Sequence, residues 1–207
     1  MSLTVDYYFA PQSPYAYLGH QRLWDLVRET GAQVRVLPVD LGGRVFPVSG
    51  GLPLSKRAPQ RQAYRLIELR RWSDYLGLPM NVEPRYFPVN SDEAARLIAA
   101  VEMKDGSEAA MTIAGAVQRA VWAEELNIAD EAVLLMLLER HGLPAQQRLD
   151  DSHSQAAHER YEANTEQAIR AGVFGAPSYV VEGELFWGQD RLDFVERRLR
   201  QAAAAAR

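Results

Sequence analysis

The spacing of hydrophobic and polar residues divides the start of the chain into a strand, a helix and a second strand. Residues 3–9 are rich in β-branched and aromatic side chains, which predicts a strand. Ser13 and Pro14 have the order of a helix N-cap and first helical residue, and Gly31 stands where the C-cap of that helix is expected. Residues 34–39 predict the second strand. A right-handed crossover would make the two strands parallel.

Helical patterns dominate the middle of the chain. Residues 42–53 are rich in glycine and proline, which predicts a loop. Helical spacing with capping residues then recurs several times. The predicted helices cover residues 60–76, 90–103, 107–126 and 130–141. We therefore expect residues 55–145 to form an all-helical insertion.

The last quarter of the chain predicts a helix, a hairpin and a final helix. The first helix is expected over residues 151–172. Two short strands, 178–181 and 184–187, flank a turn at Gly183 and would pair as an antiparallel hairpin. Asp190 is expected to cap a helix that runs into the alanine-rich end of the sequence.

The order of these elements is βαβ, helical insertion and αββα. This order is typical of an α/β fold with a thioredoxin-like domain interrupted by helices. We expect that domain to comprise residues 1–54 and 146–207, on either side of the 55–145 insertion. A chain of 207 residues with 47% hydrophobic content is large enough to bury a substantial core.

Composition narrows the classes of partner. The net charge of −4 argues against nucleic acid or an anionic membrane as the main partner. The first residues lack the basic region of a signal peptide, and no apolar run approaches the ~18 residues of a membrane span. We expect a cytoplasmic protein.

The histidines do not have the spacing of zinc ligands on a helix. His153 and His158 are five residues apart, off the face that ligands at i and i+4 share, so no metal site is predicted.

The chain contains no cysteine. A thioredoxin-like fold brings the start of its first helix, here Ser13, beside a proline loop, here residues 175–178. Without cysteine, disulfide exchange by the chain's own side chains is excluded. Any sulfur chemistry must therefore arrive on a bound thiol.

Ser13 has two compatible interpretations. It is a helix cap, and it is also a candidate site, because unpaired N–H groups and the positive dipole at a helix N-terminus attract anions. The same field lowers a thiol pKa and would stabilise a bound thiolate. The Ser13 hydroxyl would add one hydrogen-bond donor to that sulfur.

Two further segments are candidate binding elements. In the predicted fold the peptide bond before Pro177 is expected to be cis, with the N–H and C=O of Ala176 available to a peptide-like ligand by strand addition. Residues 187–191 form either a simple turn or a site in which Gln189 and Asp190 bind the amino and carboxylate groups of a small ligand.

The predicted helix at 60–76 has an arginine-rich face. Its inward side chains are expected to come from Tyr64, Ile67, Leu69 or Trp72. Acidic residues are interspersed among the arginines, which favours a solvated face or a dimer rim. The arginines are Arg57, Arg61, Arg65, Arg70 and Arg71.

Several motifs together carry a family resemblance. They are DYYF at 6–9, SPYAYL at 13–18, RW at 71–72, YLGLP at 75–79, VWAE at 121–124, GVFGAP at 172–177 and WGQDRL at 187–192. Their combination closely resembles the 2-hydroxychromene-2-carboxylate isomerases, which are related to the kappa-class glutathione transferases. The resemblance spans almost the whole chain.

This resemblance implies a glutathione-dependent isomerase that is usually a homodimer. The thiolate of glutathione would lie against Ser13, add to an electron-poor carbon of a conjugated aromatic acid, allow bond rotation and then leave, so that glutathione is a cofactor. By the same resemblance, Ala176 beside Pro177 would pair with the glutathione backbone. Its γ-glutamyl end would be held by Trp187, Gly188, Gln189 and Asp190.

The resemblance places Tyr86, Ser55 and Lys56 at the substrate. One position departs from the family, because Phe46 stands where relatives have a lysine after the second strand. An uncharged residue there would weaken attraction for a carboxylate, for which Lys56 or Arg57 would have to compensate. Two alternatives stay open: a kappa-like transferase, which would consume glutathione, and a cysteine-less thioredoxin-fold module that binds an extended peptide or protein partner.

Overall fold

The computed structural model describes residues 3–205, which contain a four-stranded sheet of order β2-β1-β3-β4. The strands are β1 (Thr4–Phe9), β2 (Gln33–Pro38), β3 (Ser178–Val181) and β4 (Glu184–Trp187). β1 is parallel to β2 and antiparallel to β3, with Tyr8 opposite Leu37 and Ser178. β3 and β4 form an antiparallel hairpin. The predicted βαβ start and the predicted hairpin are both confirmed.

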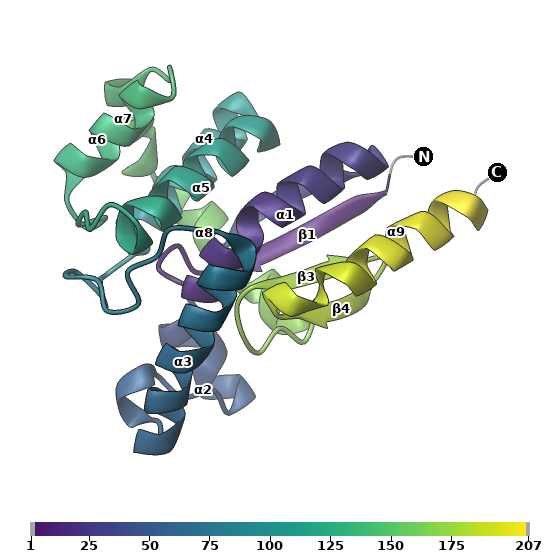
Figure 1. The fold of residues 1–207 in the computed structure, drawn as a ribbon. Helices are drawn as coiled ribbons and strands as arrows, with labels where there is room; N and C mark the ends of the chain where they lie inside the picture. The colour runs from purple at the N-terminus through teal and green to yellow at the C-terminus, as the bar shows by residue number, and fades with distance from the viewer. Residues whose placement is uncertain (1–2, 206–207) are drawn as a thin grey trace.

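The two faces of the sheet bury different helices, because successive strand residues point to opposite sides. Tyr7 and Phe9 belong to the large hydrophobic core under α1 (Pro14–Thr30), α5 (Ser107–Trp122) and α9 (Leu192–Ala205). Tyr8 belongs to a smaller cluster under α8 (Gln155–Arg170). Figure 1 shows α1 and α9 flanking the strands, with α8 behind them. The thioredoxin-like arrangement expected from the sequence is therefore present.

The start of α1 is formed as predicted. The Ser13 side chain accepts a hydrogen bond from the backbone N–H of Ala16 at 3.3 Å, and Pro14 occupies the first turn. Gly31 ends the helix with a φ of 68°, a left-handed conformation that glycine adopts at little cost.

The prediction of a loop over residues 42–53 is largely wrong. The structure instead has short helical turns, namely a π-helical turn at Leu41–Val45, α2 at Phe46–Ser49 and a 3-10 turn at Leu54–Lys56. The carboxylate of Asp40 accepts a hydrogen bond from the N–H of Gly43 at 2.7 Å, which stabilises the first turn. Gly50, with a φ of 76°, ends α2. Gly42 and Gly43 lie within the first helical turn and Gly50 ends α2, so these glycines do not form an irregular loop.

The helices of the middle segment are present. They are α3 (Pro59–Leu76), α4 (Asp92–Asp105), α5 and α6 (Glu131–Arg140). Their buried residues join those of the sheet in one hydrophobic core. The division into a 1–54 and 146–207 domain and a 55–145 insertion stays a prediction. No helix within residues 3–205 is long and apolar enough to cross a membrane.

The inward face of α3 differs from the expectation. Leu69 is fully buried and Trp72 is partly buried, but Tyr64 and Ile67 are 55% and 44% exposed. Arg65 is buried instead. The inward residues 65, 69, 72 and 76 follow a helical stripe with spacings of four, three and four. The prediction was therefore wrong for Tyr64 and Ile67.

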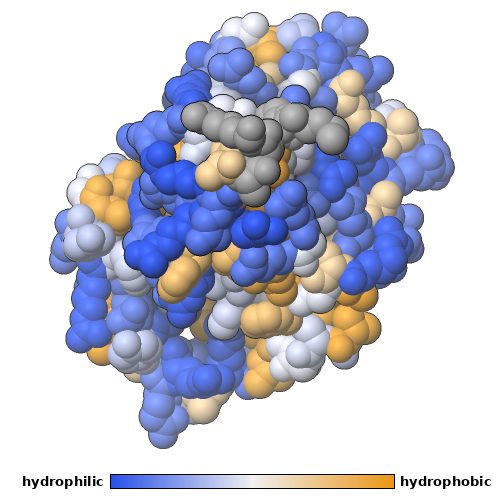
Figure 2. Space-filling model, turned by 90° about the vertical axis from the view of Figure 1, so that its right-hand side faces the viewer, coloured by the Kyte–Doolittle hydropathy of each residue, from blue (hydrophilic) through white to orange (hydrophobic). Residues whose placement is uncertain are grey.

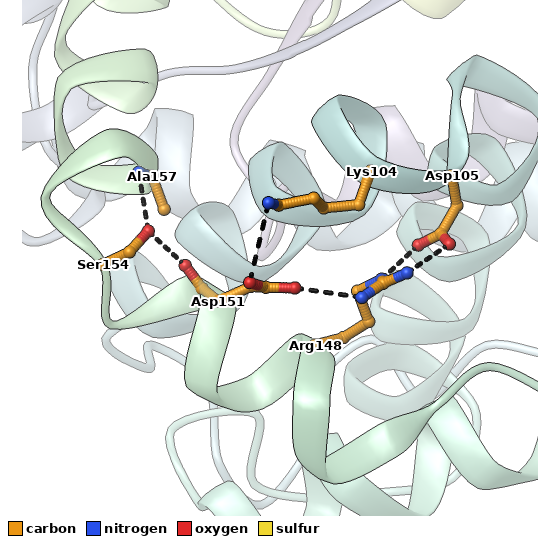
Figure 3. Close-up of polar contacts among 6 residues, drawn as sticks. All are labelled: Lys104, Asp105, Arg148, Asp151, Ser154 and Ala157. Atoms are coloured by element: carbon orange, nitrogen blue, oxygen red, sulfur yellow. Dashed lines mark hydrogen bonds and ion pairs between the residues drawn. The ribbon is translucent and has the colours of Figure 1, made fainter.

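The helix predicted over 151–172 is present as α8, which begins at Gln155 and ends at Arg170. A separate short helix, α7 (Ala145–Ser152), precedes it and was not predicted from the sequence. Ser154 starts α8, because its hydroxyl oxygen accepts from the N–H of Ala157 at 3.2 Å and its O–H donates to the carbonyl of Asp151 at 2.6 Å (Figure 3). The cap at Ser154 thus separates α8 from α7, and the predicted helix start at Asp151 was wrong.

Arg148 ties α7 to α4 (Figure 3). Its guanidinium donates two hydrogen bonds to Asp105, at 2.5 and 2.7 Å, and one to Asp151 at 3.0 Å. Lys104 lies 3.9 Å from the other carboxylate oxygen of Asp151. The Arg148 side chain is 11% exposed, so this is a largely desolvated network rather than a surface ion pair.

Candidate active site

A cavity of about 1290 Å³ opens between the start of α1, the loop before β3, the turn after β4, the 41–54 segment and α3. Cavities for single small ligands usually have about 300–1,000 Å³, so this one has room for more than one molecule. Residues that the sequence predicted and that line it are Ser13, Phe46, Ala176, Trp187, Gly188, Gln189 and Asp190. Predicted residues that do not line it are Pro177, Ser55, Lys56 and Tyr86.

Ser13 lies at the centre of this arrangement. It is 8% exposed, at the N-terminus of α1. Besides capping the helix, its hydroxyl donates a hydrogen bond to the carbonyl oxygen of Ala176 at 3.5 Å. A bond of that length is weak, so the hydroxyl can exchange this partner for a ligand. The helix N-terminus adds a positive electrostatic potential.

The loop that carries Ala176 is fixed on both sides. The peptide bond between Ala176 and Pro177 is cis. The hydroxyl of Ser178 donates to the carbonyl of Gly175 at 2.8 Å, and the carbonyl of Pro177 accepts from the N–H of Gly188 at 2.9 Å. The loop and the turn after β4 are thereby held together, although they come from different segments of the chain.

Helix α1 also positions the turn that contains Gln189. Arg22 donates to the backbone carbonyl of Gln189 at 3.2 Å and to its side-chain oxygen at 3.1 Å, and Gln189 is only 2% exposed. Gly19 permits the close approach, because a Cβ atom there would lie 2.8 Å from the Cβ of Gln189. Sequence reasoning missed Gly19 and Arg22, since no local pattern distinguishes them from ordinary helical residues.

Asp190 is exposed at the edge of the cavity. It lies in a 3-10 turn, Gln189–Arg191, and α9 begins at Leu192, two residues after the predicted cap. Its carboxylate accepts a hydrogen bond from Arg191 at 2.7 Å. The Asp190 side chain is 42% exposed, so its carboxylate can also accept a hydrogen bond from a ligand ammonium group.

Two aromatic rings form one wall of the cavity. Phe174 and Trp187 pack with ring centroids 4.7 Å apart, and Trp187 is 51% exposed. A Cβ at Gly175 would lie 2.3 Å from the indole nitrogen of Trp187, so only glycine fits there. In Figure 2, which faces the side of α9 and β4, hydrophobic side chains gather mainly in the lower half of the surface. Sequence reasoning missed Phe174.

Arginines from α3 and from the residues just before it form a basic part of the cavity lining. Arg57, Arg61 and Arg65 line the cavity, whereas Arg70 and Arg71 do not. Because Arg65 is only 8% exposed, its interpretation as part of a solvated face was wrong. The charged face of this helix is therefore divided between the cavity and the solvent.

The predicted substrate contacts are only partly gathered in this cavity. Phe46 lines the cavity, where it packs so closely on Gly51 that a Cβ there would lie 2.1 Å from its ring. Tyr86 does not line the cavity, but its neighbour Phe87 does. Likewise Arg57 lines it in place of Ser55 and Lys56. Phe87 was not named in the sequence analysis, whereas Arg57 was named there as a charge that would have to compensate for the missing lysine.

Comparison with known proteins agrees with this architecture. Residues 4–200 match the DSBA-like thioredoxin domain family. The chain is 31% identical over 199 residues to 2-hydroxychromene-2-carboxylate isomerase of Sphingobium xenophagum, covering 96% of this chain and 99% of that protein. It is 30% identical over 194 residues to the Pseudomonas putida protein of the same name, covering 94% and 93%. A solved structure of 2-hydroxychromene-2-carboxylate isomerase superposes with a TM-score of 0.84 and 28% identity, covering 98% of this chain and 97% of that one.

Proposed function

We propose that this chain, which belongs to the DsbA-like thioredoxin domains and to the 2-hydroxychromene-2-carboxylate isomerase family, is a glutathione-dependent isomerase of a conjugated aromatic acid. The observation that carries this proposal is the position of Ser13, which caps α1 and contacts Ala176 inside a large cavity. A thiolate-stabilising site in a chain without cysteine suits a thiol that arrives on a ligand.

The residues present fit glutathione, a short peptide with a thiol at its middle and charged groups at its ends. Ser13 offers an O–H donor at the positive end of a helix. Ala176 offers a backbone carbonyl whose existing bond is long and exchangeable. Asp190 offers an exposed carboxylate for an ammonium group. Ser13, Ala176 and Asp190 all line the cavity.

Glutathione, when bound, would supply a thiolate that adds to the conjugated substrate and is released after rotation about the bond that becomes single. Ser13 would donate a hydrogen bond to the sulfur, and the N-terminus of α1 would lower the pKa of the thiol. The Arg22 contacts would keep Gln189 and its turn in place for the γ-glutamyl end. Phe174 and Trp187 would shield that end from water.

The test incubates the protein with 2-hydroxychromene-2-carboxylate and with glutathione at one tenth of the substrate concentration, and measures both product and glutathione. We expect conversion of the substrate to its isomerisation equilibrium with all the glutathione recovered, and a strong loss of rate in the Ser13→Ala variant. Consumption of glutathione in proportion to product would instead identify a kappa-like transferase. Absence of both turnover and glutathione binding would favour a module that binds a peptide or protein partner.

A homodimer and a cytoplasmic location complete the proposal. The homodimer rests on the family resemblance, and the location rests on the sequence features given above. Light scattering of the purified protein tests the first. A mass of twice the 23.2 kDa chain is the expected result.

A further inference from the structure

Arg65 is a buried cation on the wall of the cavity. It comes from α3 and is 8% exposed, yet it lines the cavity. Its guanidinium carbon lies 4.9 Å from the ring centroid of Phe87 and 5.6 Å from that of Trp122. The rings of Phe87 and Trp122 pack against each other, with their centroids 4.8 Å apart. The guanidinium is therefore held over an aromatic platform.

No acidic residue neutralises this cation. Among the described residues Arg65 forms no ion pair with a carboxylate, and its Nη2 atom is buried without a hydrogen-bond partner. Burial lowers the pKa of Arg65, and the charge of Arg57 lowers it further, whereas Tyr15 raises it. A buried charge without a partner is costly, so an arrangement of this kind favours an anion that arrives from outside.

The acidic residues of the cavity wall have other partners. Glu68 accepts from Arg71 at 3.0 Å, and Asp190 accepts from Arg191 at 2.7 Å. The carboxylate of Asp40 accepts a hydrogen bond from the backbone N–H of Gly43, and that of Asp92 accepts one from the hydroxyl of Tyr161 at 3.1 Å. Among the described residues, none of these four carboxylates pairs with Arg65, so its charge is available to an incoming anion.

We propose that Arg65 binds the carboxylate of the aromatic substrate and is the residue that makes the cavity specific for acids. The planar guanidinium can donate two parallel hydrogen bonds to a carboxylate, and Arg57 adds a second positive charge. Phe87 presents a ring beside this site for the conjugated part of the substrate. This inference rests on the proposed function, in which the substrate is a conjugated acid.

Arg65 lies in the same cavity as Ser13, which suits that role. Tyr15, two residues after Ser13, also lines the cavity, and the charge of Arg65 acts to lower the pKa of Tyr15. A substrate with its carboxylate at Arg65 therefore shares one cavity with the proposed thiol site. Phe46 leaves that part of the cavity without the lysine expected from the family resemblance, and Arg65 supplies positive charge from a different element.

A purely structural role is the competing explanation, because a guanidinium over Phe87 and Trp122 also stabilises the packing of α3. The two roles differ in one measurable property. A structural cation affects all ligands equally, whereas a carboxylate-binding residue affects an acid more than its neutral analogue.

Calorimetry with cinnamate and cinnamamide tests this difference, because the two probes share one conjugated skeleton and differ in charge. We expect the native protein to bind cinnamate about tenfold or more tightly than cinnamamide. Arg65→Met should abolish this preference, and Arg65→Lys, which keeps charge without the planar fork, should retain part of it. Arg70→Met, an exposed arginine of the same helix outside the cavity, should keep the full preference.

Equal binding of both probes by the native protein would overturn the inference, and so would an unchanged preference in Arg65→Met. If Arg65→Met does not fold, an undiminished preference in Arg65→Lys overturns it instead. Because these measurements omit glutathione, they are independent of turnover. An Arg65-dependent preference without glutathione-dependent isomerisation would support the acid site and refute the proposed function.

Discussion

The hydroxyl of Ser13 and the carbonyl of Ala176 are 163 residues apart in sequence and meet at 3.5 Å. This contact joins the two halves of the proposed thiol site, the start of α1 and the loop before β3. It exists because β1 and β3 are neighbouring antiparallel strands, so the end of one lies beside the beginning of the other. The sheet therefore determines the geometry of the site.

Gly19 should be required for glutathione binding, although it lies outside the cavity wall. A Cβ there would meet the Cβ of Gln189 at 2.8 Å and the hydroxyl of Tyr179 at 2.9 Å. We expect Gly19→Ala to lower the unfolding free energy by about 1–3 kcal/mol and to weaken glutathione binding, because the Gln189 turn must move. Calorimetry and urea denaturation measure both effects. Gln21→Ala, an exposed change on the same helix, is the control, and equal behaviour of the two variants would contradict the prediction.

His20 should make the stability depend on pH. It is buried, its Nε2 lies 2.9 Å from the carbonyl oxygen of Met111, and burial lowers its pKa to about 4. Between about pH 6.5 and 4 the unfolded chain binds a proton at His20 that the folded chain does not, so stability falls as the pH falls. The loss should reach about 3 kcal/mol at most.

Urea denaturation at pH 7 and pH 4.5 measures this dependence. The fall in stability should be clearly smaller in His20→Asn than in the native protein. His158→Asn, which changes an exposed histidine, should leave the fall unchanged. An identical fall in His20→Asn and the native protein would show that other groups cause the pH dependence.

Arg148 should contribute more to stability than a surface arginine. Arg148→Met leaves Asp105 and Asp151 without their shared donor, and both carboxylates are partly buried. We expect a loss of about 1–3 kcal/mol in the free energy of unfolding. Arg140→Met removes an exposed ion pair with Glu124 and should cost less than about 1 kcal/mol. Thermal and urea unfolding compare the two, and equal losses would refute the assigned role of the network.

The elements that the sequence predicted correctly carry local signals. The strand at β1 has β-branched and aromatic residues, and α1 has its cap at Ser13, its Pro14 and its terminal Gly31 within one segment. The start of α8 was placed too early, at Asp151, because Asp151 and Ser154 both resemble caps. Only the binding of the Asp151 carboxylate to Arg148 and Lys104, from other parts of the fold, leaves Ser154 as the actual cap.

The site was predictable where topology or motif resemblance fixes it, and not where distant side chains meet. The expected neighbourhood of Ser13 and Ala176 followed from the order of strands and helices. The burial of Arg65 depends on Phe87 and Trp122, which come from two other segments of the chain. Nothing local distinguishes Arg65 from the exposed Arg70 on the same helix.

The most direct test of the proposed function is the pKa of glutathione's thiol in the complex. Calorimetry establishes binding, and the ultraviolet absorbance of the thiolate is then followed against pH in the same sample. We expect the native protein to lower the thiol pKa by at least about one unit, and Ser13→Ala to lose most of that shift while still binding the peptide. Binding with an unshifted thiol pKa, or no binding at all, would contradict a glutathione-activating site.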